Sequence, residues 1–390
     1  MTRSRNKRLL RVGVLLLLVV LLLLNFNRVV ALIGRPFGVS PDLQPGGAVV
    51  SAKLPPGFKS TVYASGLQGP RFMAIGPDGT VYVAEQGGGR VSALPDKNND
   101  GKADERLTIA DGLEGPSSVI FNEHTLIVGE HNKVTQIDIG ADGKPTGRKV
   151  LIPDLPNNGF HLTKTVLVED GRLYVAMGST CNVCDEGDDR RAAVSRYGID
   201  GTGHEIFAKG LRNAVGLALN PWTHKIWASN NGRDLMGDDT PPETVYDLNE
   251  GIDAGWPRCH AGRIIDPEFG ANGGCEGVEK PVVEMPAHMA PLGLAFYKDG
   301  PFPAPYNDSL YIALHGSWNS SEKVGYKVMR VPLKDGQVSG EPQDFMTGFL
   351  HDDGVVVDGR PAGVTVAADG SLLVSDDKGG FVYRVVWAGQ

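Results

Sequence analysis

Short apolar runs, broken by turns rich in glycine, proline and aspartate, make up most of this 390-residue chain. The runs come in pairs joined by tight turns, as at Asp170-Gly171 and at Asp369-Gly370. Asp-Gly favours a hairpin, because the turn requires residues that accept a positive φ. No stretch beyond the N-terminus has the periodicity of an amphipathic helix. The pattern therefore predicts a chain of β-hairpins.

The hairpins belong to a longer unit that recurs six times. The second strand of each hairpin is predicted at residues 81–83, 126–128, 173–175, 226–228, 310–312 and 372–374. Further apolar strands flank each hairpin, so each unit supplies about four strands, as a propeller blade does. The predicted fold is all-β, a six-bladed β-propeller. Residues 58–64 form a strand with no blade before it, and we expect it to pair beside the C-terminal strands and close the ring.

The N-terminal segment has a different pattern. Five basic residues precede an unbroken apolar run over residues 12–24. This order is typical of an export signal and directs the following chain out of the cytoplasm. The run is shorter than the roughly 20 residues of a full membrane span, so a signal peptide and an uncleaved anchor both remain open. We expect a signal or transmembrane segment at 1–33, a Pro/Gly-rich linker at 34–55 and an extracytoplasmic propeller at 56–390.

Charge and cysteine content narrow the possible functions. A net charge of -8 argues against a nucleic-acid partner, which would require a basic face. Four cysteines allow three pairings, and an exported chain favours disulfides over a zinc site. We predict the two local pairs, Cys181–Cys184 and Cys259–Cys275, because each closes a loop without reaching across the fold.

Propeller geometry brings the start of each inner strand and the end of its hairpin partner to one mouth of the central channel. Polar residues at these positions are Arg71, Ser117, His161, Arg212, Asn213 and Arg360 at the starts, and Glu85, His131, Ser179, Asn231, His315 and Asp376 at the partner ends. Arginine recognises carboxylates through two parallel hydrogen bonds. The set therefore predicts a site for an anionic ligand with several acceptor groups.

Several of these positions lie in longer motifs. The segments 210–213 (GLRN), 231–234 (NGRD) and 255–257 (GWP) resemble the core signature of the glucose/sorbosone dehydrogenase family. The segment around His161 resembles the strand that carries that family's catalytic histidine. Residues 290–296 (APLGLAF) and 315–319 (HGSWN) are similar to the sorbosone dehydrogenase branch. The resemblance covers residues 56–390.

The resemblance implies a pyrroloquinoline quinone (PQQ) cofactor with Ca²⁺, and oxidation of an aldose or a sugar aldehyde such as sorbosone. It assigns His161 as the general base, Arg212 as the residue that polarises the quinone oxygen, and Asn213 and Arg360 as cofactor contacts. The backbone carbonyls of Gly232 and Arg233 match positions that hold the calcium ion. The glucose-oxidising branch has a proline at the position of Arg233 and, near the cofactor, a lysine where this chain carries His315. The resemblance also implies a separate electron acceptor as a partner.

A second calcium candidate rests on the residues alone. Asp96, Asn98, Asp100 and Asp104, with Gly101, match the first part of an EF-hand-like loop. Leu107 replaces the usual closing glutamate, which predicts low affinity. An exposed hairpin loop rich in Asp and Asn accounts for the same residues equally well. Asp238, Asp239 and Glu243 form another acidic cluster, which either binds calcium or is solvated.

Two other functions compete with the dehydrogenase. A propeller sugar lactonase would need a channel metal held by side chains, for which Glu85, Asn231 and Asp376 are candidates. A non-catalytic propeller would bind a protein or carbohydrate. His161 and Arg212 occupy matched positions in two repeats, which favours the dehydrogenase.

The N-terminal pattern yields a direct prediction. A reporter that folds only outside the cytoplasm, fused to the C-terminus, is expected to be active, because the apolar run directs export. The control is the same fusion with residues 12–24 interrupted by charges, which is expected to be inactive. An inactive fusion of the unmodified chain, recovered intact from the cytoplasm, would contradict the prediction.

Overall fold

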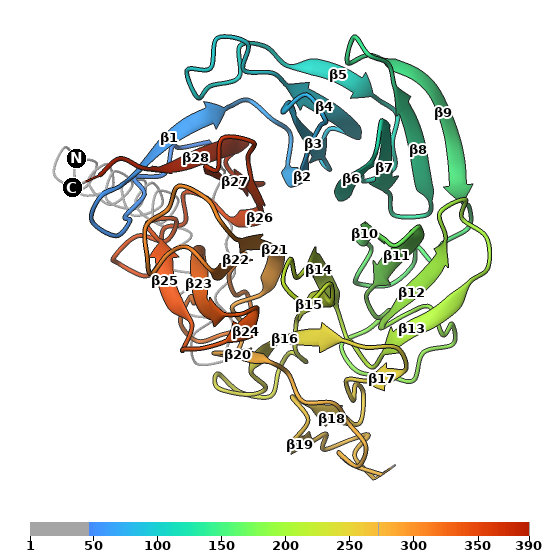
Figure 1. The fold of residues 1–390 in the computed structure, drawn as a ribbon. Coiled ribbons are helices and arrows are strands. Elements are labelled where there is room, and N and C mark those ends of the chain that lie inside the picture. Colours follow the sequence, from blue (N-terminus) through green and yellow to red (C-terminus); the bar gives the residue numbers. More distant parts are fainter. Residues whose placement is uncertain (1–46, 272, 390) are drawn as a thin grey trace, which may run out of the picture.

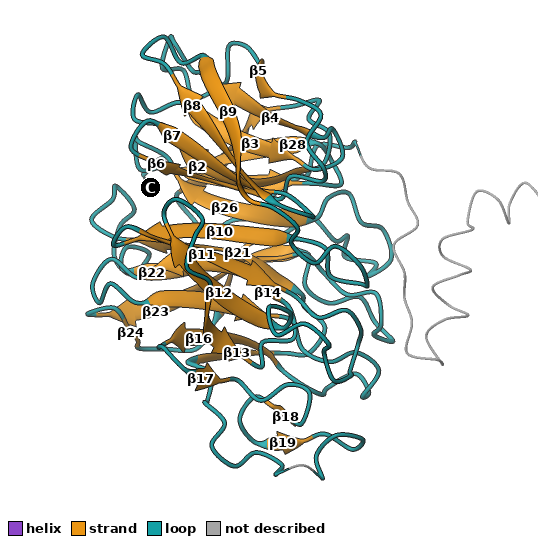
Figure 2. Ribbon diagram, turned by 90° about the vertical axis from the view of Figure 1, so that its right-hand side faces the viewer, coloured by secondary structure: helices purple, strands orange, loops and turns teal. Residues whose placement is uncertain are grey.

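The computed structural model describes residues 47–271 and 273–389. In these ranges the regular structure is all β-strand, and six sheets stand around a central channel (Figure 1). Seen from the side, the strands run across the thickness of the ring (Figure 2). The predicted six-bladed β-propeller is therefore confirmed.

Each blade is an antiparallel sheet whose strands follow one another outward from the channel. Blade 1 is β2 (Pro70–Ile75), β3 (Val81–Glu85), β4 (Arg90–Leu94) and β5 (Leu107–Ala110). Blade 2 is β6 (Ser118–Asn122), β7 (Thr125–Gly129), β8 (Val134–Ile139) and β9 (Pro145–Ile152). Blade 3 is β10 (Lys164–Glu169), β11 (Arg172–Met177), β12 (Ala193–Gly198) and β13 (Glu205–Lys209).

The second half of the ring follows the same order with two additions. Blade 4 is β14 (Ala214–Leu219), β15 (Ile226–Asn230), β16 (Glu243–Leu248) and β20 (Val283–Met285). Blade 5 is β21 (Pro291–Tyr297), β22 (Ser309–Leu314), β23 (Lys327–Lys334) and β25 (Gln343–Met346), with β24 (Gln337–Val338) also paired to β23. Blade 6 is β26 (Pro361–Val366), β27 (Leu372–Asp376), β28 (Phe381–Trp387) and β1 (Phe58–Ala64).

The excursion predicted between the fourth and fifth units separates β16 from β20. It holds β17 (Ile252–Asp253), which lies parallel to β13, and the small hairpin of β18 (Cys259–His260) and β19 (Ile264–Ile265) outside the ring (Figure 1). The Cys259–Cys275 disulfide closes this excursion, and Cys181–Cys184 closes the loop between β11 and β12. Both predicted pairings are confirmed.

Strand β1 closes the ring, as predicted. It pairs with β28, and Phe58 stands opposite Trp387. The Phe58 ring makes edge contacts with Trp387, Phe302, Tyr306 and Phe345, so it joins blade 6 to the apolar core of blade 5. Aromatic pairs of this geometry add to the burial of apolar area.

The packing of the propeller begins before residue 56. Val50 is buried, and its N–H donates to the Tyr383 hydroxyl at 3.0 Å. Lys53 forms an isolated bridge with Thr347. Residues 50–55, expected to be linker, thus already contact the blades, whereas the predicted segment 1–33 and the linker up to residue 46 lie outside the described residues. Within the part that the structure describes, no helix is long and apolar enough to cross a membrane.

The inner strands approach one another closely around the channel. Strands β2, β14, β21 and β26 each have a bulge directly after their first residue. Val215, Leu292 and Ala362 from three of these bulges pack together with Phe72 from the fourth, and we call this cluster the channel plug. A side chain at Gly216 would collide with the Leu292 carbonyl, and Ser229 donates to that same oxygen at 2.7 Å. Beyond the plug a cavity of about 280 Å³ remains between the inner strands.

Removing the closure contact is expected to destabilise the whole ring. Phe58→Ala should lower the free energy of unfolding by about 3–5 kcal/mol, because a buried phenylalanine and its aromatic partners are lost. The control is Phe160→Ala, the same change at a side chain that is 74% exposed, with an expected effect within about 0.5 kcal/mol. Urea unfolding followed by tryptophan fluorescence measures both. If the two substitutions lowered the free energy of unfolding equally, the role of Phe58 in closing the ring would be contradicted.

Candidate functional site

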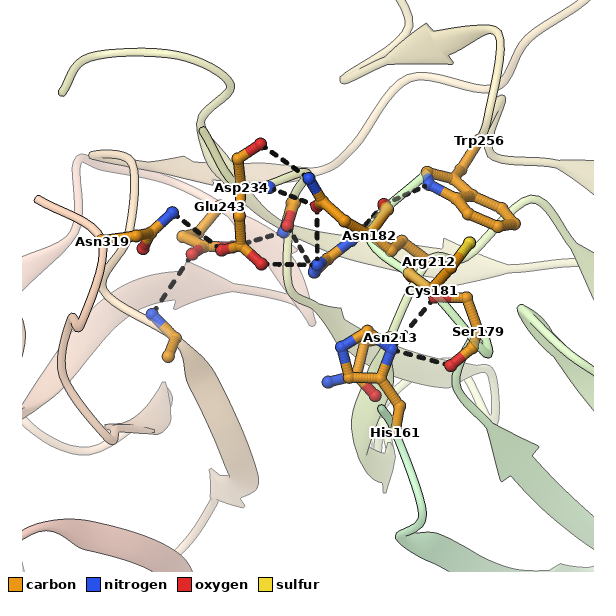
Figure 3. Close-up of polar contacts among 12 residues, drawn as sticks. His161, Ser179, Cys181, Asn182, Arg212, Asn213, Asp234, Glu243, Trp256 and Asn319 are labelled. Carbon is orange, nitrogen blue, oxygen red and sulfur yellow. Dashed lines mark hydrogen bonds and ion pairs between the residues drawn. The ribbon is translucent and has the colours of Figure 1, made fainter. Parts of the chain in front are cut away.

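The starts of the inner strands and the ends of their partners meet at one channel mouth. Pro70 stands opposite Glu85, Ala214 opposite Asn230, and Pro361 opposite Asp376 in the sheet registers. Figure 3 shows His161, Ser179, Arg212 and Asn213 gathered there, together with Asn182 and Asp234 from the adjoining loops.

His161 lies in the loop that leads into β10. Its Nδ1 is 3.0 Å from both the carbonyl and the hydroxyl oxygen of Ser179. The Ser179 hydroxyl donates its proton to the Cys181 carbonyl at 2.7 Å, so it can only accept from the imidazole. Nδ1 therefore carries the proton, and the lone pair of Nε2 is free to act as a base.

The electrostatic surroundings keep His161 neutral. Burial lowers its pKa to about 3, and the charges of Arg212 and Arg191 add to the effect, while the hydrogen bond to Ser179 opposes it. Arg191 also fixes the loop, because it donates to the carbonyls of His161 and Asn158. The imidazole is thus held in one orientation and one protonation state.

Asn213 packs against His161 across Gly178. A side chain at Gly178 would collide with the Oδ1 of Asn213 and the Cβ of His161, so only glycine permits this approach. Asn213 Oδ1 is buried and has no hydrogen-bond partner. A buried acceptor without a partner costs about 1–3 kcal/mol, which marks it as a group that a ligand satisfies.

Arg212 is buried and almost fully engaged by the protein. Its Nε donates to the Asn182 carbonyl at 2.9 Å, and Nη2 donates to Asn182 Oδ1 at 3.0 Å and to Asp234 at 2.6 Å. Nη1 donates to the Gly232 carbonyl at 2.6 Å. One of the five N–H groups is left for a ligand. Arg212 can therefore act on a quinone only through this one N–H group and through the positive charge of its guanidinium.

These bonds bear on the predicted calcium site. The Gly232 carbonyl already accepts from a guanidinium, and the Arg233 side chain pairs with Asp266 and Glu268. A carbonyl bound by one cation is a poor ligand for a second. The donor set at Gly232 and Arg233, as arranged here, does not fit a calcium ion.

Glu243 completes the support of this loop instead of joining an acidic cluster. It accepts from the N–H of Gly232 at 2.7 Å, and burial raises its pKa to about 7. Asp238 and Asp239 are exposed, so the three residues do not form one site.

On the opposite side of the mouth, Asp377 links His315 to Arg71. Both carboxylate oxygens of Asp377 lie 2.9 Å from His315 Nε2, and Arg71 donates to Asp377 at 2.7 Å. Burial and the charge of Arg360 lower the pKa of His315 to about 4, although Asp377 opposes this. Arg360 donates Nε and Nη2 to the carbonyls of His315 and Gly316, which leaves its Nη1 for a ligand.

Three basic side chains of the mouth have no acidic side chain next to them. Among the described residues, no carboxylate oxygen lies within 4.0 Å of the charged nitrogens of Lys164, Arg191 or Arg360. Burial, with repulsion from Arg191 and Arg190, lowers the pKa of Lys164 to about 7. An incoming anion would stabilise these charges. They fit a ligand that carries several carboxylates, whereas the unsatisfied Asn213 Oδ1 needs a hydrogen-bond donor on the ligand. PQQ carries carboxylates and a ring N–H.

Side-chain metal ligands are sparse in the described ranges. The one group of three His, Cys, Asp or Glu ligand atoms close enough to share an ion there is Cys181, Cys184 and Glu186, and its cysteines form a disulfide. In the loop of Asp96, Asn98, Asp100 and Asp104, the side chains bond one another and nearby backbone N–H groups. That calcium site stays a prediction.

The residues offered for a metal-dependent lactonase bond to the protein, although the Oδ2 of Asp376 is buried without a hydrogen-bond partner. Glu85 accepts from Gln68, Arg90 and Ser92 around its own turn, and Asn231 donates to the Pro291 carbonyl. Asp376 accepts from Arg360 N–H and Gly379 N–H, and burial raises its pKa to about 7. Among the described residues, Glu85 and Asp376 belong to no group of three His, Cys, Asp or Glu ligand atoms close enough to share an ion.

Sequence reasoning missed four residues of this site. They are Lys164, Arg191, Asn182 and Asp377. Lys164 and Asp377 are one to three residues from the positions that the repeat selected, so a wider window would have included them. Arg191 and Asn182 lie in the loop between β11 and β12, whose place in the repeat varies, and only the Cys-x-x-C around Asn182 signalled it.

A polar pocket of about 790 Å³ adjoins the loop of His161, between blades 2 and 3. Asn158, Arg191 and Thr180 line its side nearest the mouth, and His161 itself does not line it. Its other walls include Asp154 and Asp188.

A family model described as TrAA12-like matches residues 52–249 and 268–388. The chain belongs to this TrAA12-like family. An uncharacterized protein of Borreliella burgdorferi is 28% identical over 352 residues, which cover 86% of this chain and 90% of that protein. The PQQ-dependent pyranose dehydrogenase of Coprinopsis cinerea is 25% identical over 84% of this chain. The match spans 54% of that enzyme, so this TrAA12-like chain corresponds to about half of its length.

Solved structures agree on the fold. The holo form of the pyranose dehydrogenase PQQ domain from Coprinopsis cinerea superimposes with a TM-score of 0.74, at 22% identity. It covers 87% of this TrAA12-like chain and 98% of that domain. The resemblance to PQQ-dependent sugar dehydrogenases is confirmed at the level of the family, whereas the sorbosone branch stays a prediction.

The lowered pKa of His161 predicts a pH dependence of stability. Between about pH 4 and 6 the unfolded chain binds a proton at this histidine, whose ordinary pKa is about 6.5, and the folded chain does not. The stability that His161 contributes is therefore complete above pH 6.5 and is lost as pH falls towards 3, by at most about 1.4 kcal/mol for each pH unit. His161→Gln should flatten the dependence of the unfolding free energy on pH, measured by urea titration without cofactor. His224→Gln, at an exposed histidine, should keep the wild-type slope. A wild-type slope in His161→Gln would contradict the assignment.

Proposed function

We propose that this chain is a PQQ-dependent dehydrogenase that oxidises an aldose or a sugar aldehyde, with His161 as the general base. One observation carries the proposal: the free Nε2 of a neutral, oriented His161 lies at the same channel mouth as Lys164, Arg191 and Arg360, which have no carboxylate oxygen within 4.0 Å in the described chain.

The roles of the chain's residues follow from their contacts. Bound PQQ would accept the hydride from the substrate carbon. His161 Nε2 accepts the proton of the substrate hydroxyl, and Ser179 holds the ring in the required tautomer. The basicity of His161 rises when negative charge enters the mouth, because that charge offsets Arg212 and Arg191, which lower its pKa. The base therefore becomes effective in the loaded site.

The residues that would hold the cofactor are those with unsatisfied groups. Arg360 offers Nη1, Arg212 offers one N–H, and Asn213 offers its buried Oδ1. Lys164 supplies an ammonium that is buried with one carbonyl partner, Leu162. These groups suit the carboxylates and polar ring atoms of a tricarboxylate quinone.

The substrate class rests on the pocket and on the relatives. The pocket beside the His161 loop is lined by amides and carboxylates, such as Asn158 and Asp188, which suit sugar hydroxyls. The Coprinopsis cinerea relative is a pyranose dehydrogenase by name. We further propose that the enzyme works outside the cytoplasm, held at the membrane or released, and passes electrons to a separate acceptor. The basic and apolar N-terminus supports this location.

The proposal is tested by adding PQQ to the purified protein and measuring dye-linked oxidation of a panel of aldoses. His161→Ala should reduce turnover by about 100- to 10,000-fold, because a positioned base is lost, while quinone affinity stays nearly unchanged. Arg212→Ala should weaken quinone binding and turnover together, because the lost charge acts on the cofactor.

A matched control separates the loss of the base from the loss of any histidine. His204→Ala removes a histidine in the connection between β12 and β13, bonded to Ser195, and should leave turnover within a few-fold of wild type. If His161→Ala kept near wild-type turnover, another residue would be the general base. Absence of quinone binding by the unmodified protein would refute the dehydrogenase.

A further inference from the structure

The loop between β11 and β12 brings a disulfide to the candidate active site. Cys181 and Cys184 close a ring of four residues, and Asn182 lies inside it. Figure 3 shows Asn182 between Arg212, Asp234 and Trp256, all of which come from blade 4 or the excursion that follows it. A disulfide-closed loop of blade 3 thus contacts the neighbouring part of the ring.

Asn182 uses both its side chain and its backbone in these contacts. Its Oδ1 accepts from Arg212 Nη2 at 3.0 Å and from the Asp234 N–H at 2.8 Å, and its Nδ2 donates to the Asp234 carbonyl at 3.0 Å. Its carbonyl accepts from Arg212 Nε at 2.9 Å and from Trp256 Nε1 at 3.3 Å. Both Nε and Nη2 of the Arg212 guanidinium therefore bond to one residue.

The same loop also contacts the base. Ser179, whose hydroxyl sets the tautomer of His161, donates to the carbonyl of Cys181. Asp234, held by Asn182 on its backbone, bonds Arg212 with one carboxylate oxygen and Asn319 of blade 5 with the other. The loop therefore links the base, the guanidinium and the next blade.

We propose that Asn182 is a positioning residue for Arg212, and that the Cys181–Cys184 disulfide holds Asn182 in place. Arg212 Nε bonds to the backbone carbonyl of Asn182 and not to its side chain. The position of Arg212 therefore depends on the backbone conformation of the loop as well as on the side-chain amide of Asn182. Opening the disulfide frees this segment and weakens the hold on Arg212. The functional part of this inference rests on the proposed function.

The first test needs neither cofactor nor activity. The Asp234 amide donates to Asn182 Oδ1, so its hydrogen exchange should speed up in Asn182→Ala and in the double variant Cys181→Ser/Cys184→Ser. The Gly232 amide donates to Glu243 instead and serves as the internal reference. Unchanged protection of the Asp234 amide in both variants would overturn the proposal.

The second test asks whether the effect passes through Arg212. Asn182→Ala and the double serine variant should each weaken PQQ binding by about 10-fold or more, because bonds to a charged group are lost. In an Arg212→Ala background the same changes should add less than about 2-fold, because the group that they position is gone. If the same changes weakened PQQ binding in that background as much as they do in the wild type, Asn182 would have a merely structural role and the proposal would be overturned.

Asn220→Ala is the matched control. Asn220 is a buried asparagine at the end of β14 away from the mouth. Its side chain accepts from the N–H groups of Trp222 and Thr223 in the turn between β14 and β15 and donates to the Gly336 carbonyl of blade 5. The substitution should lower stability without changing PQQ affinity. If the unmodified protein binds no quinone, the proposed function fails, whereas faster Asp234 exchange in the variants would still establish the positioning role.

Discussion

The close approach of the inner strands is the constraint on which the rest of the molecule depends. Gly216 lets β14 meet the Leu292 carbonyl of the next blade, and Ser229 bonds that oxygen. The bulges that follow the first residues of these strands direct Val215, Leu292 and Ala362 into the channel plug. In blade 1 the matching position holds Arg71, which reaches Asp377 and acts on His315. The same backbone geometry thus places apolar side chains in the channel plug and a charged side chain, Arg71, next to them.

The basic side chains at the channel mouth suit an anionic ligand although the chain as a whole is acidic. The net charge of -8 is spread over the molecule, whereas Lys164, Arg191 and Arg360 lie at the mouth without a carboxylate within 4.0 Å in the described chain. Burial makes the charges of Lys164 and Arg191 costly and therefore responsive to a ligand. Arg212 differs, because Asp234 and Asn182 already compensate it. Its main influence is the field that it exerts on His161.

The sequence predicts the parts of the structure that repeat from blade to blade, and it does not predict contacts between loops that differ from blade to blade. Alternating apolar runs and Asp-Gly turns placed the blades, and the surplus strand at residues 58–64 indicated the closure, because both follow from local periodicity. The same register placed His161, Arg212, Asn213 and Arg360 at one mouth. It gave no sign that Arg212 would bond the Gly232 carbonyl, since that contact depends on how two loops pack. Arg191 was missed for the same reason, because its loop has no fixed place in the repeat.

The pairing of β1 with β28 has a consequence for biosynthesis. The strand that completes blade 6 is made first, and its partners are made last. The ring therefore stays open until the final strand leaves the ribosome, and Phe58 has no complete core to enter before then. Long-range pairing of this kind carries a loop-closure cost that early local contacts do not offset. Chains that lack β28 expose the edge of β1 and the residues of the channel plug, which makes them substrates for chaperones and proteases until β28 has been made.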